Sequence, residues 1–93
     1  MRLRWKLFAN LAETAGEREV TVTVDEATVD AALDALFETC PELRDEVLDD
    51  EGVLYDHVRL LHNSEDPFAR ADGLATAVEP EDELALFPPV SGG

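Results

Sequence analysis

The chain closes with the run Asp82-Glu83-Leu84-Ala85-Leu86-Phe87-Pro88-Pro89-Val90-Ser91-Gly92-Gly93. Its first half, Glu83 to Phe87, alternates apolar side chains as a half-buried strand does. Pro88 and Pro89 fix φ and favour an extended backbone. The run therefore predicts a domain over residues 1–87 that ends in a strand, followed by an extended tail over residues 88–93.

The Gly-Gly ending has two interpretations. It could be a frayed terminus, because terminal residues are often disordered. It could also be a slim end that a partner enzyme draws into a tunnel, since Gly92 and Gly93 have no side chain to obstruct entry. The strand and the two prolines directly before it favour the second interpretation, and we expect the carboxylate of Gly93 to be free.

Length and charge exclude several classes of protein. Ninety-three residues are enough for one domain with a single core. The formal net charge is −15, with 22 acidic residues against seven lysines and arginines. Nucleic acids and anionic membranes are both disfavoured as partners, because phosphate groups would be repelled.

The acidic charge itself leaves two explanations open. A specific basic partner could be steered by it. Alternatively, it could be the surface adaptation of a halophilic protein, because at about 1 M salt the Debye length is only about 3 Å and self-repulsion is screened. The acids are spread along the whole chain and Lys6 is the only lysine, so we favour the halophilic explanation.

The chain offers no convincing metal or disulfide chemistry. Cys40 is the only cysteine, and only His57 and His62 accompany it, so there is no convincing set of metal ligands. Cys40 ends a helical pattern and is most simply a small buried residue. Residues 1–6 carry positive charge with no long apolar run after them, so we expect a cytoplasmic protein without a signal peptide.

Periodicity predicts an α+β domain. We expect strands over residues 3–7, 18–24, 57–62 and 83–87, a main helix capped by Thr28 and stopped by Pro41, short turns over 10–16 and 43–48, and a short edge strand within 65–80. Two strands joined by a short connection suggest an antiparallel pair. The first and last strands should lie together in the centre of a mixed sheet, with the helix packed across one face.

Three apolar residues fall out of phase with the buried face of this sheet. Leu3, Trp5 and Leu7 point inward at every second residue, so Phe8 falls on the outward side. Leu61 and Phe87 likewise fall on the outward side of their own strands. If the first and last strands are neighbours, Phe8 and Phe87 share the side of the sheet away from the helix. Exposed apolar residues gathered in this way predict a partner-binding site.

The ending resembles that of MoaD/ThiS-type ubiquitin-like proteins. This group includes the small sulfur-carrying subunit of molybdopterin synthase, and the chain is similar above all to the haloarchaeal small archaeal modifier proteins. Lys6-Leu7-Phe8-Ala9, followed by Leu11-Ala12-Glu13 and Gly16, also resembles the group's first strand and turn. Residues 64–78 depart from the group because they are longer and less regular.

The resemblance implies a β-grasp fold and a carrier function. An E1-like enzyme would use ATP to adenylate Gly93, with no cofactor permanently bound to the chain itself. Sulfur would then attack to give a thiocarboxylate, or a lysine amine would attack to give an isopeptide bond. Phe8, Leu61 and Phe87 would contact partners together with the tail residues, which are Pro88, Pro89, Val90, Ser91 and Gly92.

Two uses of this chemistry stay open. As a sulfur carrier, the chain would serve the large subunit of molybdopterin synthase in molybdenum cofactor biosynthesis. As a modifier, it would be joined to lysines of target proteins, and Lys6 is a possible acceptor on the chain itself. The alternative is a β-grasp interaction module with an inert tail. We expect no independent enzyme, because no acid-base pair, activated nucleophile or phosphate loop is visible.

The halophilic explanation predicts how stability depends on salt. The thermal unfolding midpoint should rise as potassium chloride is increased from dilute to molar concentration, because salt screens the repulsion among the carboxylates. Circular dichroism melting curves measure this directly. A midpoint that is indifferent to salt would rule the explanation out.

Overall fold

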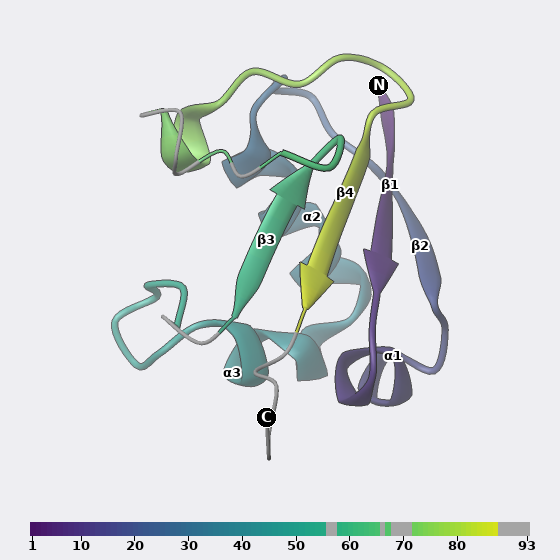
Figure 1. Ribbon diagram of the computed structural model, residues 1–93, viewed down its shortest axis with the longest axis vertical. Coiled ribbons are helices and arrows are strands. Elements are labelled where there is room, and N and C mark those ends of the chain that lie inside the picture. Colours follow the sequence, from purple (N-terminus) through teal and green to yellow (C-terminus); the bar gives the residue numbers. More distant parts are fainter. Residues whose placement is uncertain (56–57, 66, 68–71, 88–93) are drawn as a thin grey trace.

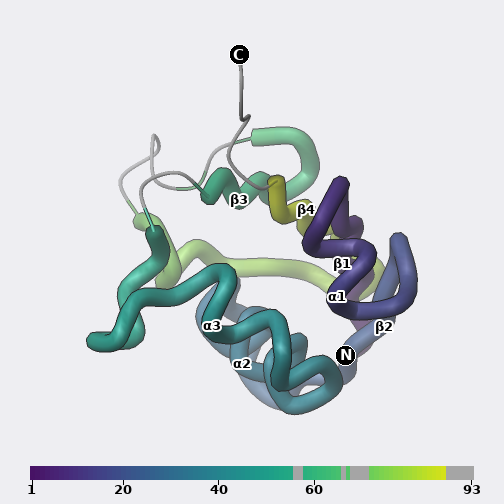
Figure 2. The backbone as a smooth tube through the Cα atoms, turned by 90° about the horizontal axis from the view of Figure 1, so that it is seen from below, coloured from purple at the N-terminus to yellow at the C-terminus, as the bar shows by residue number. Residues whose placement is uncertain are grey.

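A four-stranded mixed sheet forms one layer of the molecule (Figure 1). Figure 2 shows the helices α2 and α3 together on one side of it. The computed structural model describes residues 1–55, 58–65, 67 and 72–87. The elements along the chain are β1 (Arg2–Leu7), α1 (Asn10–Ala15), β2 (Glu19–Thr23), α2 (Val29–Thr39), the 3₁₀ turn η1 (Pro41–Leu43), α3 (Arg44–Val47), β3 (Arg59–His62), the 3₁₀ turn η2 (Gly73–Ala75) and β4 (Glu83–Phe87). The predicted α+β class is confirmed.

The strands lie in the order β2-β1-β4-β3. β1 pairs antiparallel with β2 and parallel with β4, and β3 pairs antiparallel with β4. Figure 1 shows β1 and β4 side by side and pointing the same way. The first and last strands therefore occupy the centre of the sheet, as the sequence predicts.

The core lies between the sheet and α2. Alternate residues of β1, β2 and β4 point into it, and α2 contributes one face; the principal members are Leu3, Trp5, Leu7, Val20, Val22, Val29, Leu33, Leu36, Leu84 and Leu86. Trp5 is fully buried, and its indole N–H donates to the carbonyl oxygen of Ala32 at 3.0 Å. This hydrogen bond satisfies the one polar group of the largest core side chain.

Local sequence signals account for both ends of α2. Thr28 is extended at φ −133°, and its hydroxyl oxygen accepts from the Ala31 N–H at 3.1 Å, so the predicted N-cap is confirmed. The helix ends at Thr39, and Pro41 begins the next turn. The shorter α1 ends at Gly16, whose φ of 80° is the left-handed conformation that glycine adopts without strain.

The connection between β3 and β4 differs from the prediction. A short edge strand was expected within residues 65–80, but the described part of this segment holds η2 and two isolated bridges, Thr28–Ala77 and His62–Glu65. The reason is that its backbone bonds to the start of α2: the Val78 N–H donates to Ala27 and the Val29 N–H donates to Thr76, both at 3.0 Å. The segment thus crosses the helix end instead of extending the sheet.

Truncating the helix face should weaken the fold markedly. Leu36 is fully buried, so Leu36→Ala removes apolar burial and leaves a cavity, which should cost about 2–5 kcal/mol of unfolding free energy. Asp34→Ala, on the exposed face of the same helix, should change it by no more than about 0.5 kcal/mol. Urea unfolding measures both, and equal losses would contradict this packing.

Candidate functional site

Phe8 and Phe87 stack on the face of the sheet away from α2. Their ring centroids are 4.3 Å apart and the rings are inclined by only 11°. Phe8 comes one residue after β1 and Phe87 is the last residue of β4, so the parallel pairing of Leu7 with Leu86 brings the two rings together. The predicted proximity of these two residues is confirmed.

The same face, which we call the outer sheet face, carries the third out-of-phase residue. Leu61 is half-buried and lies opposite Ala85 in the β3–β4 ladder. Ala85 is two residues from Phe87 on the same side of β4. Sequence reasoning missed Ala85, although it lies between the inward Leu84 and Leu86 and could have been found by the same alternation. The four residues form a small apolar patch.

The aromatic pair remains accessible at its Phe8 end. Phe8 is 39% exposed, one of few large apolar residues with such exposure in the described part of the chain. It also borders an open hollow whose other walls come from α1 and the turn before β2. A stacked pair of rings beside a hollow offers a partner both apolar area and shape.

The tail residues predicted as the reactive end are Pro88, Pro89, Val90, Ser91, Gly92 and Gly93, and all lie outside the described residues. The structure describes their point of attachment. Phe87, the last residue of β4, is itself one of the two stacked rings. The tail is therefore attached to the domain next to this patch.

Lys6 lies on the outer sheet face as well. Its Nζ is 3.1 Å from Oε1 of Glu83, and its side chain is 46% exposed. The other primary amine of the chain, the N-terminal ammonium of Met1, donates to the carbonyl oxygen of Val24 at 3.0 Å in a partly buried setting. Each of the two amines thus has one partner, and only the bond of the Met1 ammonium is partly buried.

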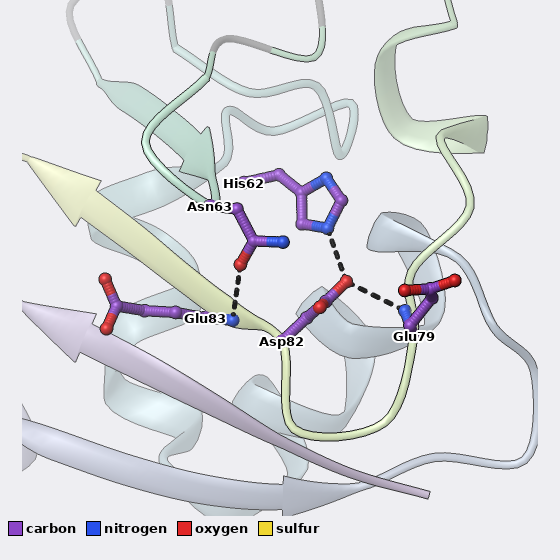
Figure 3. Close-up of polar contacts among 5 residues, drawn as sticks. All are labelled: His62, Asn63, Glu79, Asp82 and Glu83. Atoms are coloured by element: carbon purple, nitrogen blue, oxygen red, sulfur yellow. Dashed lines mark hydrogen bonds and ion pairs between the residues drawn. The ribbon is translucent and has the colours of Figure 1, made fainter.

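A polar network fixes the start of β4 (Figure 3). Asp82 Oδ2 lies 2.7 Å from Nε2 of His62 and accepts from the Glu79 N–H at 2.8 Å. The Glu83 N–H donates to the side-chain oxygen of Asn63 at 2.9 Å. The network joins the end of β3 to the turn before β4, so it helps to set where β4 begins. Sequence reasoning did not find it, because its partners are about twenty residues apart.

This network has an electrostatic consequence. Burial alone would raise the pKa of Asp82, but hydrogen bonds from His62, the Glu79 N–H and Asn63 hold that pKa below its ordinary value of 3.8. The carboxylate therefore stays ionised in the folded protein. His62 serves here as a structural partner.

Cys40 is a buried residue of the core. Burial, with the carboxylates of Glu17 and Glu42, raises the pKa of its thiol, so the thiolate is disfavoured. In the part of the chain that the structure covers, no group of three or more His, Cys, Asp or Glu side chains could hold a metal ion; His57 lies outside it. No helix among the described residues is long and apolar enough to cross a membrane.

The chain that carries this site is similar to several known proteins over nearly its whole length. A model described as the ThiS family matches residues 5–93. Small archaeal modifier protein 1 of Haloferax volcanii is 58% identical over 92 residues, which cover 98% of this chain and 100% of that protein. Its crystal structure superposes with a TM-score of 0.90 at 52% identity, covering 100% of both chains. The solution structure of the Methanosarcina acetivorans protein of that name gives 0.84 at 32% identity, covering 99% of this chain and 96% of that one.

The Asp82 network predicts a pH-dependent contribution to stability. A carboxylate whose folded pKa is depressed stabilises the fold above its unfolded pKa, and this contribution is lost as the pH falls through the folded value. Asp82→Asn should therefore lower the unfolding free energy near neutral pH, and the gap to the wild type should close in acid.

Urea unfolding between pH 7 and pH 2.5 is the measurement. Asp50→Asn, on the exposed turn before β3, changes the net charge equally and should leave the curve close to that of the wild type. If the two variants behave alike, the network contributes nothing to stability.

Proposed function

This chain belongs to the ThiS family, and we propose that it is a ubiquitin-like protein modifier and sulfur carrier whose reactive atom is the carbonyl carbon of Gly93. The observation that carries the proposal is the 58% identity, across nearly the whole chain, to a protein named as an archaeal modifier. The β-grasp architecture agrees with this assignment. The chain is then a substrate or small subunit of enzymes and not itself an enzyme.

The chemistry of the terminus follows from the weakness of a carboxylate as an electrophile. An E1-like enzyme transfers AMP from ATP to the Gly93 carboxylate and releases pyrophosphate. In the resulting acyl-adenylate, AMP is the leaving group. A sulfur nucleophile then displaces AMP to give a thiocarboxylate, or the acyl group passes to a lysine amine as an isopeptide. Gly92 and Gly93 have no Cβ to obstruct either attack.

Two outcomes use this one activated terminus. As a thiocarboxylate, the chain delivers sulfur within molybdopterin synthase, with the large subunit as its partner. As an acyl donor, it modifies lysines of target proteins. We assign both roles to the chain and place them in the cytoplasm. ATP is consumed by the activating enzyme, and no cofactor stays bound to the carrier.

The domain and the tail have different roles in this proposal. Residues 1–87 form the domain that a partner recognises, and Phe8, Leu61 and Phe87 supply the apolar contact next to the tail. Residues 88–93 span roughly 20 Å when extended, enough to enter a deep active site. The stacking of Phe8 on Phe87 supports this division, because it places the apolar patch where the tail leaves the sheet.

Lys6 is the acceptor amine when the chain itself is modified. Two observations support it over the N-terminus: the Lys6 side chain is 46% exposed and its ion pair with Glu83 lies on the surface, whereas the bond from the Met1 ammonium to Val24 is partly buried. Arg2 and Arg4, its outward neighbours on β1, carry no acylatable amine at neutral pH because guanidinium stays protonated.

The decisive test of the carrier proposal is the mass of the native terminus. Protein purified from cells with the activating enzyme should include a species heavier by the difference between sulfur and oxygen, and target lysines should carry Gly-Gly remnants after proteolysis. Cells without that enzyme should show neither signal. Intact and peptide mass spectrometry measure both.

Deletion of Gly92 and Gly93 should abolish both signals while the melting curve stays unchanged, because the deletion leaves the described core intact. Persistence of either signal in the deleted form would refute the role of Gly93. An unmodified terminus in every sample would favour the rival function, an interaction module with an inert tail.

A further inference from the structure

The strand β2 has one edge that no other described strand covers. It stands first in the order β2-β1-β4-β3, and Figure 1 shows no described element beyond it on that side of the sheet. Proteins usually protect such an edge with proline, a bulge or several charges. β2 reads Glu-Val-Thr-Val-Thr over Glu19–Thr23 and pairs with β1 in an unbroken register. With a single charged residue and three valines or threonines at its centre, it is well suited to accept a further strand.

The β1–β2 ladder determines which backbone groups this edge presents. The backbones of Met1 and Val24 exchange two hydrogen bonds at the end of the ladder. Bonded and non-bonded pairs alternate along an antiparallel ladder, so the other residues of β2 alternate in the same way. The N–H and C=O groups of Glu19, Thr21 and Thr23 therefore point away from β1, toward the open edge. All three side chains are exposed on the outer sheet face.

We propose that β2 pairs antiparallel with β2 of a second copy of this chain, around a two-fold axis at Thr21. Thr21 then lies opposite Thr21 of the second copy, and Glu19 lies opposite Thr23 of the second copy. Each of these pairs exchanges two backbone hydrogen bonds, because outward residues meet outward residues. All five residues of β2 find partners in this register. The two-fold contact is closed, so it joins two sheets into one and produces a dimer.

Charges on the outer sheet face agree with this register. Glu19 and Arg2 are exposed, and neither forms a salt bridge with a described residue. Arg2 lies opposite Thr23 in the β1–β2 ladder, so Arg2 of the second copy lies next to the threonine that Glu19 faces. The Cα atoms of Glu19 and that arginine are about 10 Å apart across a short residue, a span that the two long side chains bridge. A strand of unrelated sequence lacks this matched pair, which is why we assign the edge to a second copy.

The acidity of the chain predicts that the dimer forms only in concentrated salt. Each copy carries a formal charge of −15, so the copies repel one another in dilute buffer, and molar salt screens most of that repulsion. β4, which ends where the tail begins, is separated from β2 by β1. The contact therefore leaves the tail of each copy accessible, and the inference does not depend on the proposed function.

Sedimentation equilibrium tests the dimer with the full chain at up to about 1 mM, because a contact of five residues belongs to the weak class of interfaces. The protein should be monomeric in dilute buffer and form a dimer at about 2 M potassium chloride. Thr21→Pro removes the outward N–H at the two-fold axis and should weaken association at least about tenfold, although proline is tolerated on an edge strand. Thr21→Val keeps the backbone groups and the branched shape, so it is the matched control and should still form the dimer.

Cysteine cross-linking tests the register, in a Cys40→Ala background and with oxidised glutathione as the oxidant. In molar salt Thr21→Cys should form a disulfide-linked dimer, because its Cα atoms are about 5.5 Å apart in the pairing, inside the range of roughly 4.4–6.8 Å that a disulfide spans. Thr23→Cys alone should not, since its two copies are roughly 13 Å apart along the strands. A mixture of the Glu19→Cys and Thr23→Cys proteins should give the mixed disulfide.

Three results would overturn the inference. The first is a wild type that stays monomeric in molar salt, which would leave the edge for a strand of another protein or for none. The second is a dimer that persists in Thr21→Pro, which would place the contact on another surface. The third is Thr23→Cys cross-linking as fast as Thr21→Cys. Circular dichroism verifies that each variant is folded, and if Thr21→Pro is not, the cross-linking experiment decides.

Discussion

The parallel pairing of β1 with β4 is the constraint on which the rest of the structure depends. It joins the two ends of the domain in the centre of the sheet, so every other element must be accommodated in the connection between them. On the inner side it places Trp5 beside Leu84 above the helix. On the outer side it continues into the stacking of Phe8 on Phe87, where the tail begins. The core and the candidate site therefore lie on opposite sides of the same pair of strands.

Much of this arrangement could be predicted from the sequence because its signals are local. Alternation with a period of two identifies the inward residues of the strands, and it also reveals Phe8, Leu61 and Phe87 as out of phase. Thr28 and Pro41 bound the main helix because capping and the missing N–H of proline act within a few residues. A site built from such exceptions to a pattern can be predicted from the sequence once the pairing of the first and last strands is assumed.

The remaining features depend on contacts between distant residues, which no local pattern encodes. The connection before β4 departs from the predicted edge strand because its backbone bonds to the start of α2. The turn around it uses positive φ at Asn63, Ser64 and Glu81, conformations that the residue types alone do not specify. The outward placement of Arg4 and Arg59 on one face likewise emerges only when β1 and β3 are known to share a sheet. The roles of residues 88–93 rest on chemistry and family membership.

The position of Trp5 has a spectroscopic consequence. It is the only tryptophan in the chain, and its indole is sealed in the core and hydrogen-bonded to Ala32. Its fluorescence will therefore be that of a shielded, blue-shifted indole. A complex formed on the opposite side of the sheet will leave this emission nearly unchanged. The chain consequently carries a built-in optical reporter of its interior that can be read in the presence of bound proteins whose own tryptophans are absent or replaced.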